Sequence, residues 1–157
     1  MSTVREHAST MHYRRFGRTE LKIPGISCGG MRFQESWKSD DDISDKSQAN
    51  LEACVHRALE AGINHFETAR GYGTSEEQLG RILPSLPRED LIVQTKVGPM
   101  PDVEKFKATF EKSIVLLKLD YIALFSFHGI NNAECLDNTL RCWDAAEKWR
   151  DEGRIRA

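Results

Sequence analysis

Three ionisable side chains stand at the ends of short apolar runs in this sequence. Glu67, Lys96 and His128 each close or follow such a run. A fourth candidate, Tyr72, lies in the loop 70–73, whose two glycines allow the sharp turns that would return a phenol over a sheet. Parallel strands end at one edge of a sheet, where α/β folds place their active sites. We therefore expect the four side chains to converge.

Together these groups suit the donation of a proton to a carbonyl oxygen while a hydride reaches the carbonyl carbon. An ammonium group near the Tyr72 phenol favours the phenolate, so Lys96 would strengthen the phenol as a proton donor. The Glu67 carboxylate would fix the lysine, and the His128 imidazole would orient the substrate oxygen. The sequence thus indicates an oxidoreductase that acts on a carbonyl group.

Other interpretations of the same residues stay open. Glu67 and Lys96 can form a structural ion pair, His128 can be a hydrogen-bonded strand end, and Tyr72 can pack on the next helix. A chemical alternative is a lyase in which Lys96 forms a Schiff base with a carbonyl substrate. A non-enzymatic alternative is a truncated or split chain without activity of its own that pairs with another chain.

The elements that must position these groups alternate along the chain. Apolar runs rich in β-forming residues predict strands, and apolar residues at three-and-four spacing predict helices. Thr74 and Glu77 have the spacing of a capping box, which predicts a helix start there. Such alternation requires parallel pairing, in an open doubly wound sheet or in part of a barrel. The predicted strands are 26–28, 63–66, 91–95 and 121–127, and the predicted helices are 51–59, a short one from residue 74, 103–117 and 136–149.

Three segments complete the expected organisation. Residues 1–12 are polar and predict a flexible tail, and residues 13–25 alternate around a glycine-containing turn, which predicts a small hairpin. Residues 26–157 contain the strand and helix pattern. Within them, the segment 34–46 is poor in apolar residues and predicts a solvated loop.

Composition narrows the classes of function. The 157 residues are 39% apolar and carry a formal net charge of -2, which fits a globular domain and does not favour nucleic-acid binding. No stretch approaches the ~18 apolar residues of a membrane span, and the first twelve residues have no apolar signal core. We therefore expect a cytoplasmic protein that binds neither nucleic acid nor membrane.

The four cysteines predict no metal site. None forms a C-x-x-C pair, so we expect reduced structural thiols. His65 and Glu67 have the H-x-E spacing of zinc deaminases, but the P-C-x-x-C motif that accompanies it there is missing. We expect no bound metal.

Five segments, taken together, resemble the aldo-keto reductase family, in order and at its spacing. The resemblance implies a (β/α)8 TIM barrel, of which this chain would supply the first four β/α units after an N-terminal β-hairpin. It also implies reduction of aldehydes and ketones with NADP(H). The five segments are 13–17, 28–31, 64–73, 94–97 and 127–129.

The resemblance also assigns roles to residues. It implies that Tyr72 is the general acid, Lys96 its activator and His128 the residue that positions the carbonyl. Glu67 would be the carboxylate paired with the lysine. The predicted contacts with the cofactor are Gly30, Met31 and Glu67.

Two features depart from the family pattern. The family's usual aspartate is Glu67 here, as in a bacterial branch whose longer members can carry a C-terminal iron-sulfur region, although this chain has no cysteine pattern for such a cluster. The second departure is length, because a complete barrel takes ~250 residues and this sequence has 157. The resemblance implies that the main phosphate and adenine contacts come from later units, and we expect the open edges to aggregate or to pair with a second chain that completes the barrel.

Overall fold

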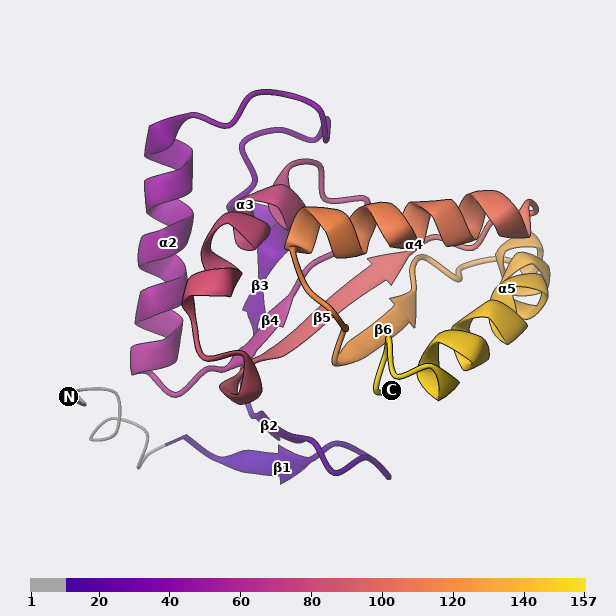
Figure 1. The fold of residues 1–157 in the computed structure, drawn as a ribbon, viewed down its shortest axis with the longest axis horizontal. Coiled ribbons are helices and arrows are strands. Elements are labelled where there is room, and N and C mark those ends of the chain that lie inside the picture. The colour runs from indigo at the N-terminus through magenta and orange to yellow at the C-terminus, as the bar shows by residue number, and fades with distance from the viewer. Residues whose placement is uncertain (1–10) are drawn as a thin grey trace.

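Four parallel strands form the central sheet of the computed structural model, which describes residues 11–157 (Figure 1). The strands lie side by side in chain order, and each is shorter than or shifted from its predicted range. This arrangement confirms the predicted α/β class with a parallel sheet. The strands are β3 (Cys28–Gly29), β4 (His65–Glu67), β5 (Ile92–Val97) and β6 (Leu124–Phe127).

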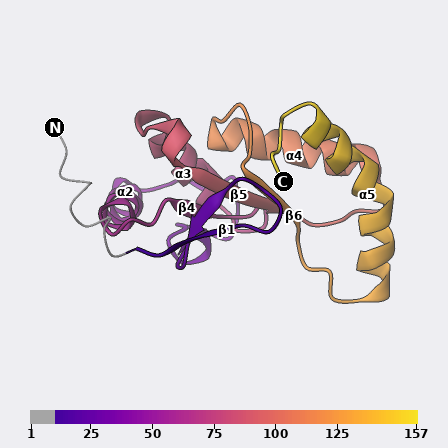
Figure 2. The same cartoon turned by 90° about the horizontal axis from the view of Figure 1, so that it is seen from below.

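Helices connect these strands and lie along one face of the sheet (Figures 1 and 2). Three of them have an N-cap side chain. The side-chain oxygens of Ser44, Asp102 and Asn132 each accept a hydrogen bond from a backbone N–H of the first turn of the helix that follows. Because Ser44 caps the first helix, that helix begins before the predicted residue 51. The helices are α2 (Asp45–Glu60), α3 (Ser75–Ile82), α4 (Val103–Leu117) and α5 (Ala133–Asp151).

The predicted capping box at the start of α3 is wrong. The Thr74 side chain makes no capping bond. Its hydroxyl oxygen instead accepts the backbone N–H groups of Glu35 at 3.0 Å and Ser36 at 3.2 Å. The threonine therefore joins α3 to the loop after β3.

The hydrophobic core lies between the sheet and its helices. Phe66, Phe106, Phe110 and Leu117 are almost completely buried there. Phe110 stacks on Trp149 of α5 with ring centroids 3.9 Å apart. These contacts explain the helical periodicity of the apolar residues, because each helix turns its apolar stripe toward the sheet.

Residues 13–24 form the antiparallel hairpin that the sequence predicts, with β1 (Tyr13–Arg15) paired to β2 (Lys22–Pro24). The Tyr13 hydroxyl attaches the hairpin to the end of α2 by donating to the Gly62 carbonyl at 2.5 Å. The predicted tail lies mostly outside the described residues. At the other end of the chain, the Phe125 N–H donates to the Ala157 carbonyl at 2.8 Å, so the last residues run beside β6.

The cysteines are all free thiols, but they are not all buried. Cys142 is buried, whereas Cys54 is exposed on α2. The free thiols agree with the expectation of reduced cysteines, and the exposure of Cys54 shows that it is not a core residue. Among residues 11–157, none of the helices is long and apolar enough to cross a lipid bilayer.

Candidate active site

The structure brings the four predicted side chains together at the carboxyl edge of the sheet. Glu67 is the last residue of β4, and Lys96 is the last but one of β5. His128 directly follows β6, where its backbone N–H donates to the Val97 carbonyl at 2.9 Å. Tyr72 comes from the loop between β4 and α3. We refer to these four residues as the catalytic cluster.

Glu67 and Lys96 form an ion pair in the catalytic cluster. The Lys96 ammonium also donates a hydrogen bond to the Thr68 carbonyl at 3.0 Å. The lysine side chain is only 14% exposed, and this burial lowers its pKa from 10.5 to about 8. The carboxylate opposes that shift, because an adjacent negative charge favours the protonated amine.

Tyr72 lies between the lysine and the histidine. The Lys96 nitrogen is 4.7 Å from the centroid of the Tyr72 ring, so the ammonium faces the ring. The His128 ring meets the same phenol ring edge to face, with centroids 5.4 Å apart. Burial, with a smaller effect from Lys96, lowers the pKa of His128 below its usual value of 6.5. The imidazole is therefore neutral at pH 7.

Backbone contacts return Tyr72 over the sheet. In the loop after β4, the Arg70 N–H donates to the Lys96 carbonyl at 2.9 Å, and the Tyr72 N–H donates to the Ala69 carbonyl at 2.9 Å. Gly73 has a positive φ of 54°. A Cβ atom at Gly73 would lie 1.8 Å from the Ser36 carbonyl oxygen, so only glycine fits at this crossing of two loops.

A buried ion pair connects the loop that carries Tyr72 to the start of α3. Arg70 contacts Glu76, whose side chain is completely buried at the start of α3. The second Glu76 oxygen accepts a hydrogen bond at 2.6 Å from Thr95, the residue before Lys96. The carboxylate thus links the loop that carries Tyr72 to the strand that carries the lysine. No local sequence pattern indicates this network, because Arg70, Glu76 and Thr95 come from the loop, from α3 and from β5.

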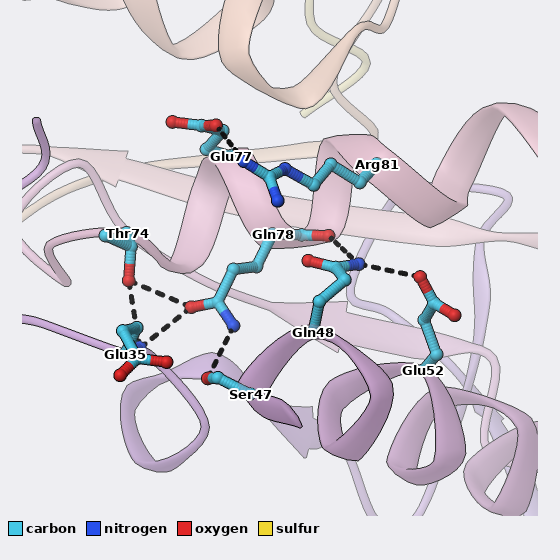
Figure 3. Close-up of polar contacts among 8 residues, drawn as sticks. All are labelled: Glu35, Ser47, Gln48, Glu52, Thr74, Glu77, Gln78 and Arg81. Carbon is cyan, nitrogen blue, oxygen red and sulfur yellow. Dashed lines mark hydrogen bonds and ion pairs between the residues drawn. The ribbon is translucent and has the colours of Figure 1, made fainter. Parts of the chain in front are cut away.

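A second polar network fixes the loop after β3 (Figure 3). Gln78 of α3 is completely buried, and its side-chain oxygen accepts the Glu35 N–H at 2.9 Å. Its amide nitrogen donates to the Ser47 hydroxyl at 3.1 Å. The segment predicted to be a solvated loop is thus anchored at residues 35–36 to α3. Trp37 follows this anchor and is 61% exposed.

Two glycines lie directly beside the cluster. A Cβ atom at Gly29 would lie 3.6 Å from a Glu67 carboxylate oxygen, and one at Gly71 would lie 3.7 Å from the His128 ring. Glycine at both positions therefore keeps further side chains away from Glu67 and His128. Gly30 and Met31 begin a short 3-10 helix directly after Gly29. The residues present therefore fit the nicotinamide end of a dinucleotide.

The chain belongs to the aldo/keto reductase family, whose profile matches residues 25–157. An uncharacterized oxidoreductase of Bacillus subtilis, YqkF, is 30% identical over 93% of this chain and 47% of its own length. L-galactose dehydrogenase of Arabidopsis thaliana is 29% identical over 91% of this chain and 46% of its own length.

The fold agrees with this assignment. A thermostable aldo-keto reductase, solved in complex with the inhibitor epalrestat, superposes with a TM-score of 0.76 at 26% identity. The superposition covers 93% of this chain and 52% of that protein. The chain thus spans about half the length of the relatives that it matches.

Proposed function

We propose that the full protein is an NADP(H)-dependent oxidoreductase that reduces an aldehyde or ketone to an alcohol. The observation that carries this proposal is the position of Tyr72 between a buried lysine and a neutral imidazole. The sheet and helices would be the first four units of a (β/α)8 barrel. Family membership supports both statements.

Tyr72 is the proton donor in this proposal. The Lys96 ammonium stabilises negative charge on the phenolate that remains after the proton has moved to the carbonyl oxygen. Glu67 holds the lysine side chain at the sheet edge, where the Thr68 carbonyl accepts one of its hydrogens. The lysine must be protonated for this role, so its pKa of about 8 sets the upper end of the working pH range.

His128 positions the substrate. A neutral imidazole has one N–H that can donate to a carbonyl oxygen, and the edge-to-face contact with Tyr72 fixes the orientation of its ring. The two groups would therefore approach the same oxygen from two sides.

Gly30, Met31 and Glu67 would hold the nicotinamide end of the cofactor. NADP(H), when bound, supplies the hydride for the carbonyl carbon. Gly30 packs closely against the next strand and helix, because a Cβ atom there would lie 2.6 Å from the Ser75 hydroxyl oxygen. This contact gives the segment before Met31 a fixed position. We propose a cytoplasmic protein without an iron-sulfur cluster in this chain.

The experiment that tests the proposal is the substitution Tyr72→Phe in the natural full-length protein. We expect NADPH oxidation with a panel of aldehydes to fall by about 10²–10⁴-fold, the usual contribution of a general acid. Binding of NADPH, measured by fluorescence titration, should persist. Tyr121→Phe is the matched control, because Tyr121 precedes β6 and so lies at the end of that strand opposite His128. Unchanged turnover in Tyr72→Phe overturns the proposal, and trapping of a substrate on Lys96 by borohydride would favour the lyase instead.

A further inference from the structure

A second set of polar side chains lies directly beneath the catalytic cluster. Residues i and i+2 of a strand face the same side of a sheet, so the residues two positions before Glu67, Lys96 and His128 occupy the adjacent level. His65 precedes Glu67 in this way, and Gln94 precedes Lys96. We refer to this set as the polar layer, and its members are Ser27, His65, Gln94 and Ser126.

The polar layer is one continuous hydrogen-bonded chain that begins at Ser27, an exposed residue just before β3, and crosses β4, β5 and β6. The Ser27 hydroxyl lies 2.7 Å from His65 Nδ1, and His65 Nε2 lies 3.0 Å from Gln94 Oε1. The Gln94 amide nitrogen donates to the Ser126 hydroxyl oxygen at 3.0 Å. His65 is only 5% exposed. Each strand that carries a residue of the cluster therefore also carries a member of the layer.

The hydrogen bonds have a defined direction. Because the Gln94 amide nitrogen donates to Ser126, the amide oxygen must accept from His65, and Nε2 of the imidazole carries the proton. Nδ1 of a neutral imidazole then accepts the Ser27 hydroxyl. Burial lowers the pKa of His65 below 6.5, and the nearby Lys96 ammonium adds to this effect, while the bond to Gln94 opposes it. These influences keep His65 neutral at pH 7.

Polar side chains at this level are unusual. The interior levels of parallel barrels are filled mainly by bulky branched apolar residues, and burial of polar groups is favourable only when each is hydrogen-bonded. Apolar contacts have no preferred direction, whereas hydrogen bonds fix the relative height of two side chains. A polar layer is thus suited to hold neighbouring strands at one defined register.

We propose that His65 and Gln94 are positioning residues, and that the polar layer sets the heights at which Glu67, Lys96 and His128 meet. The inference rests on the proposed carbonyl reduction, because it assigns a purpose to the alignment of those groups. The charged and titratable groups that face the layer are Lys96 on β5, Glu67 on β4 and His128 after β6. The layer supports these groups without contacting the substrate.

The test compares two variants of His65 in the natural full-length protein. His65→Leu removes both hydrogen bonds, and we expect kcat to fall by about 10²-fold, as a misplacement of about 1 Å can cause. KM for NADPH should change far less than kcat, because the main phosphate and adenine contacts are expected in later units, and the basic limb of the pH profile, which Lys96 sets, should shift. His65→Gln retains an N–H directed toward Gln94, and it should restore kcat to within several-fold of wild type. Wild-type kcat in His65→Leu overturns the proposal.

A second measurement does not depend on catalysis. Nitrogen NMR of the histidine side chains should find His65 neutral at pH 7 with the proton on Nε2. A proton on Nδ1, or a charged imidazole, contradicts the direction of the chain and overturns the proposal. This result is independent of the Tyr72→Phe test, so failure of the layer and failure of the proposed function can be distinguished.

A milder variant covers the case in which His65→Leu fails to fold. Ser126→Ala removes only the last acceptor of the layer, so we expect a smaller fall in kcat, again with much less change in KM for NADPH. Ser113→Ala is the matched control, since Ser113 is a buried serine of α4 outside the site. Equal kcat values in the two serine variants contradict the proposal.

Discussion

The two flanks of the sheet differ in how completely their side chains are covered. On the flank of β4 and α3, Glu76 and Gln78 are fully buried, and both have partners in neighbouring segments. On the flank of β6 and α5, Leu136, Leu140 and Trp143 are each about half exposed or more, at 50%, 62% and 49%. A hollow of about 650 Å³, lined in part by Trp143, lies between the hairpin turn, β6 and α5.

The contacts that position the catalytic cluster thus lie on a different flank from the exposed apolar side chains. The contacts that aim Tyr72 and Lys96 are short bonds within residues 27–128, so the geometry of the cluster is determined inside this part of the chain. The hollow does not include the cluster, although it reaches Phe127, the residue before His128. Exposed apolar side chains that gather on one face are typical of an interaction surface. In a complete barrel, later units would cover this face.

The largest loss of stability is expected at Gly73, where the loop after β4 crosses the loop after β3 on the covered flank. Gly73→Ala places a methyl group against the Ser36 carbonyl at a positive φ. We expect it to lower the free energy of unfolding by about 3–5 kcal/mol, from left-handed strain and overpacking together. Gly129→Ala is the matched control, since Gly129 also has a positive φ but nothing within 4 Å. It should cost only about 1–2 kcal/mol in denaturant unfolding, and equal costs would contradict the account.

The buried ion pair should give the next largest effect. Glu76→Gln leaves the Arg70 charge without its partner, which should cost about 3 kcal/mol of unfolding free energy. Activity should fall as well, because Glu76 links the Tyr72 loop to β5. Glu111→Gln breaks an exposed pair with Arg154 and should cost less than about 1 kcal/mol. A small cost at Glu76 would show that the pair does not stabilise this flank.

Because of Lys96, a rise in pH should increase the stability of the protein and decrease its activity. Its folded pKa of about 8 lies below its usual 10.5, so between these pH values the unfolded chain binds more protons. Stability should therefore rise with pH in that window, by at most about 3 kcal/mol, and the Glu67 contact reduces this gain. Activity should fall above pH 8 as the ammonium is lost. Lys96→Arg, which keeps its charge, should flatten both profiles, and unchanged profiles would exclude Lys96 as their source.

The smallest effect is expected on the open flank. Leu140→Gln in the 157-residue chain should change the unfolding free energy by less than about 0.5 kcal/mol, because the side chain is mostly in solvent. Repeating the measurement in the natural full-length protein sharpens the comparison. A cost of about 2 kcal/mol there would show that other residues cover α5, as expected of a buried leucine. The same large cost in the 157-residue chain would contradict the exposed position.

The sequence predicted the helices, the strands and the catalytic cluster better than it predicted the long-range polar contacts that hold them in place. Alternating apolar runs predicted the parallel sheet, and strand-end positions predicted that Glu67, Lys96 and His128 would lie at one edge. The capping box failed because the Thr74 hydroxyl binds a loop some forty residues earlier in the chain. Such long-range pairs leave no local pattern. Most of the polar layer does have a local signal, since His65, Gln94 and Ser126 stand two positions before cluster residues, and period-two spacing would have found these three.

The most direct test of the account follows the hydride. NADPH carrying deuterium at both C4 positions is supplied to the natural full-length protein together with an aldehyde that it reduces, and the product is analysed by mass spectrometry and NMR. We predict one deuterium on the carbinol carbon of the alcohol, with the label almost absent from the product when Tyr72→Phe is incubated for the same time. An alcohol without deuterium, or an equal yield of labelled alcohol from Tyr72→Phe, would contradict the account.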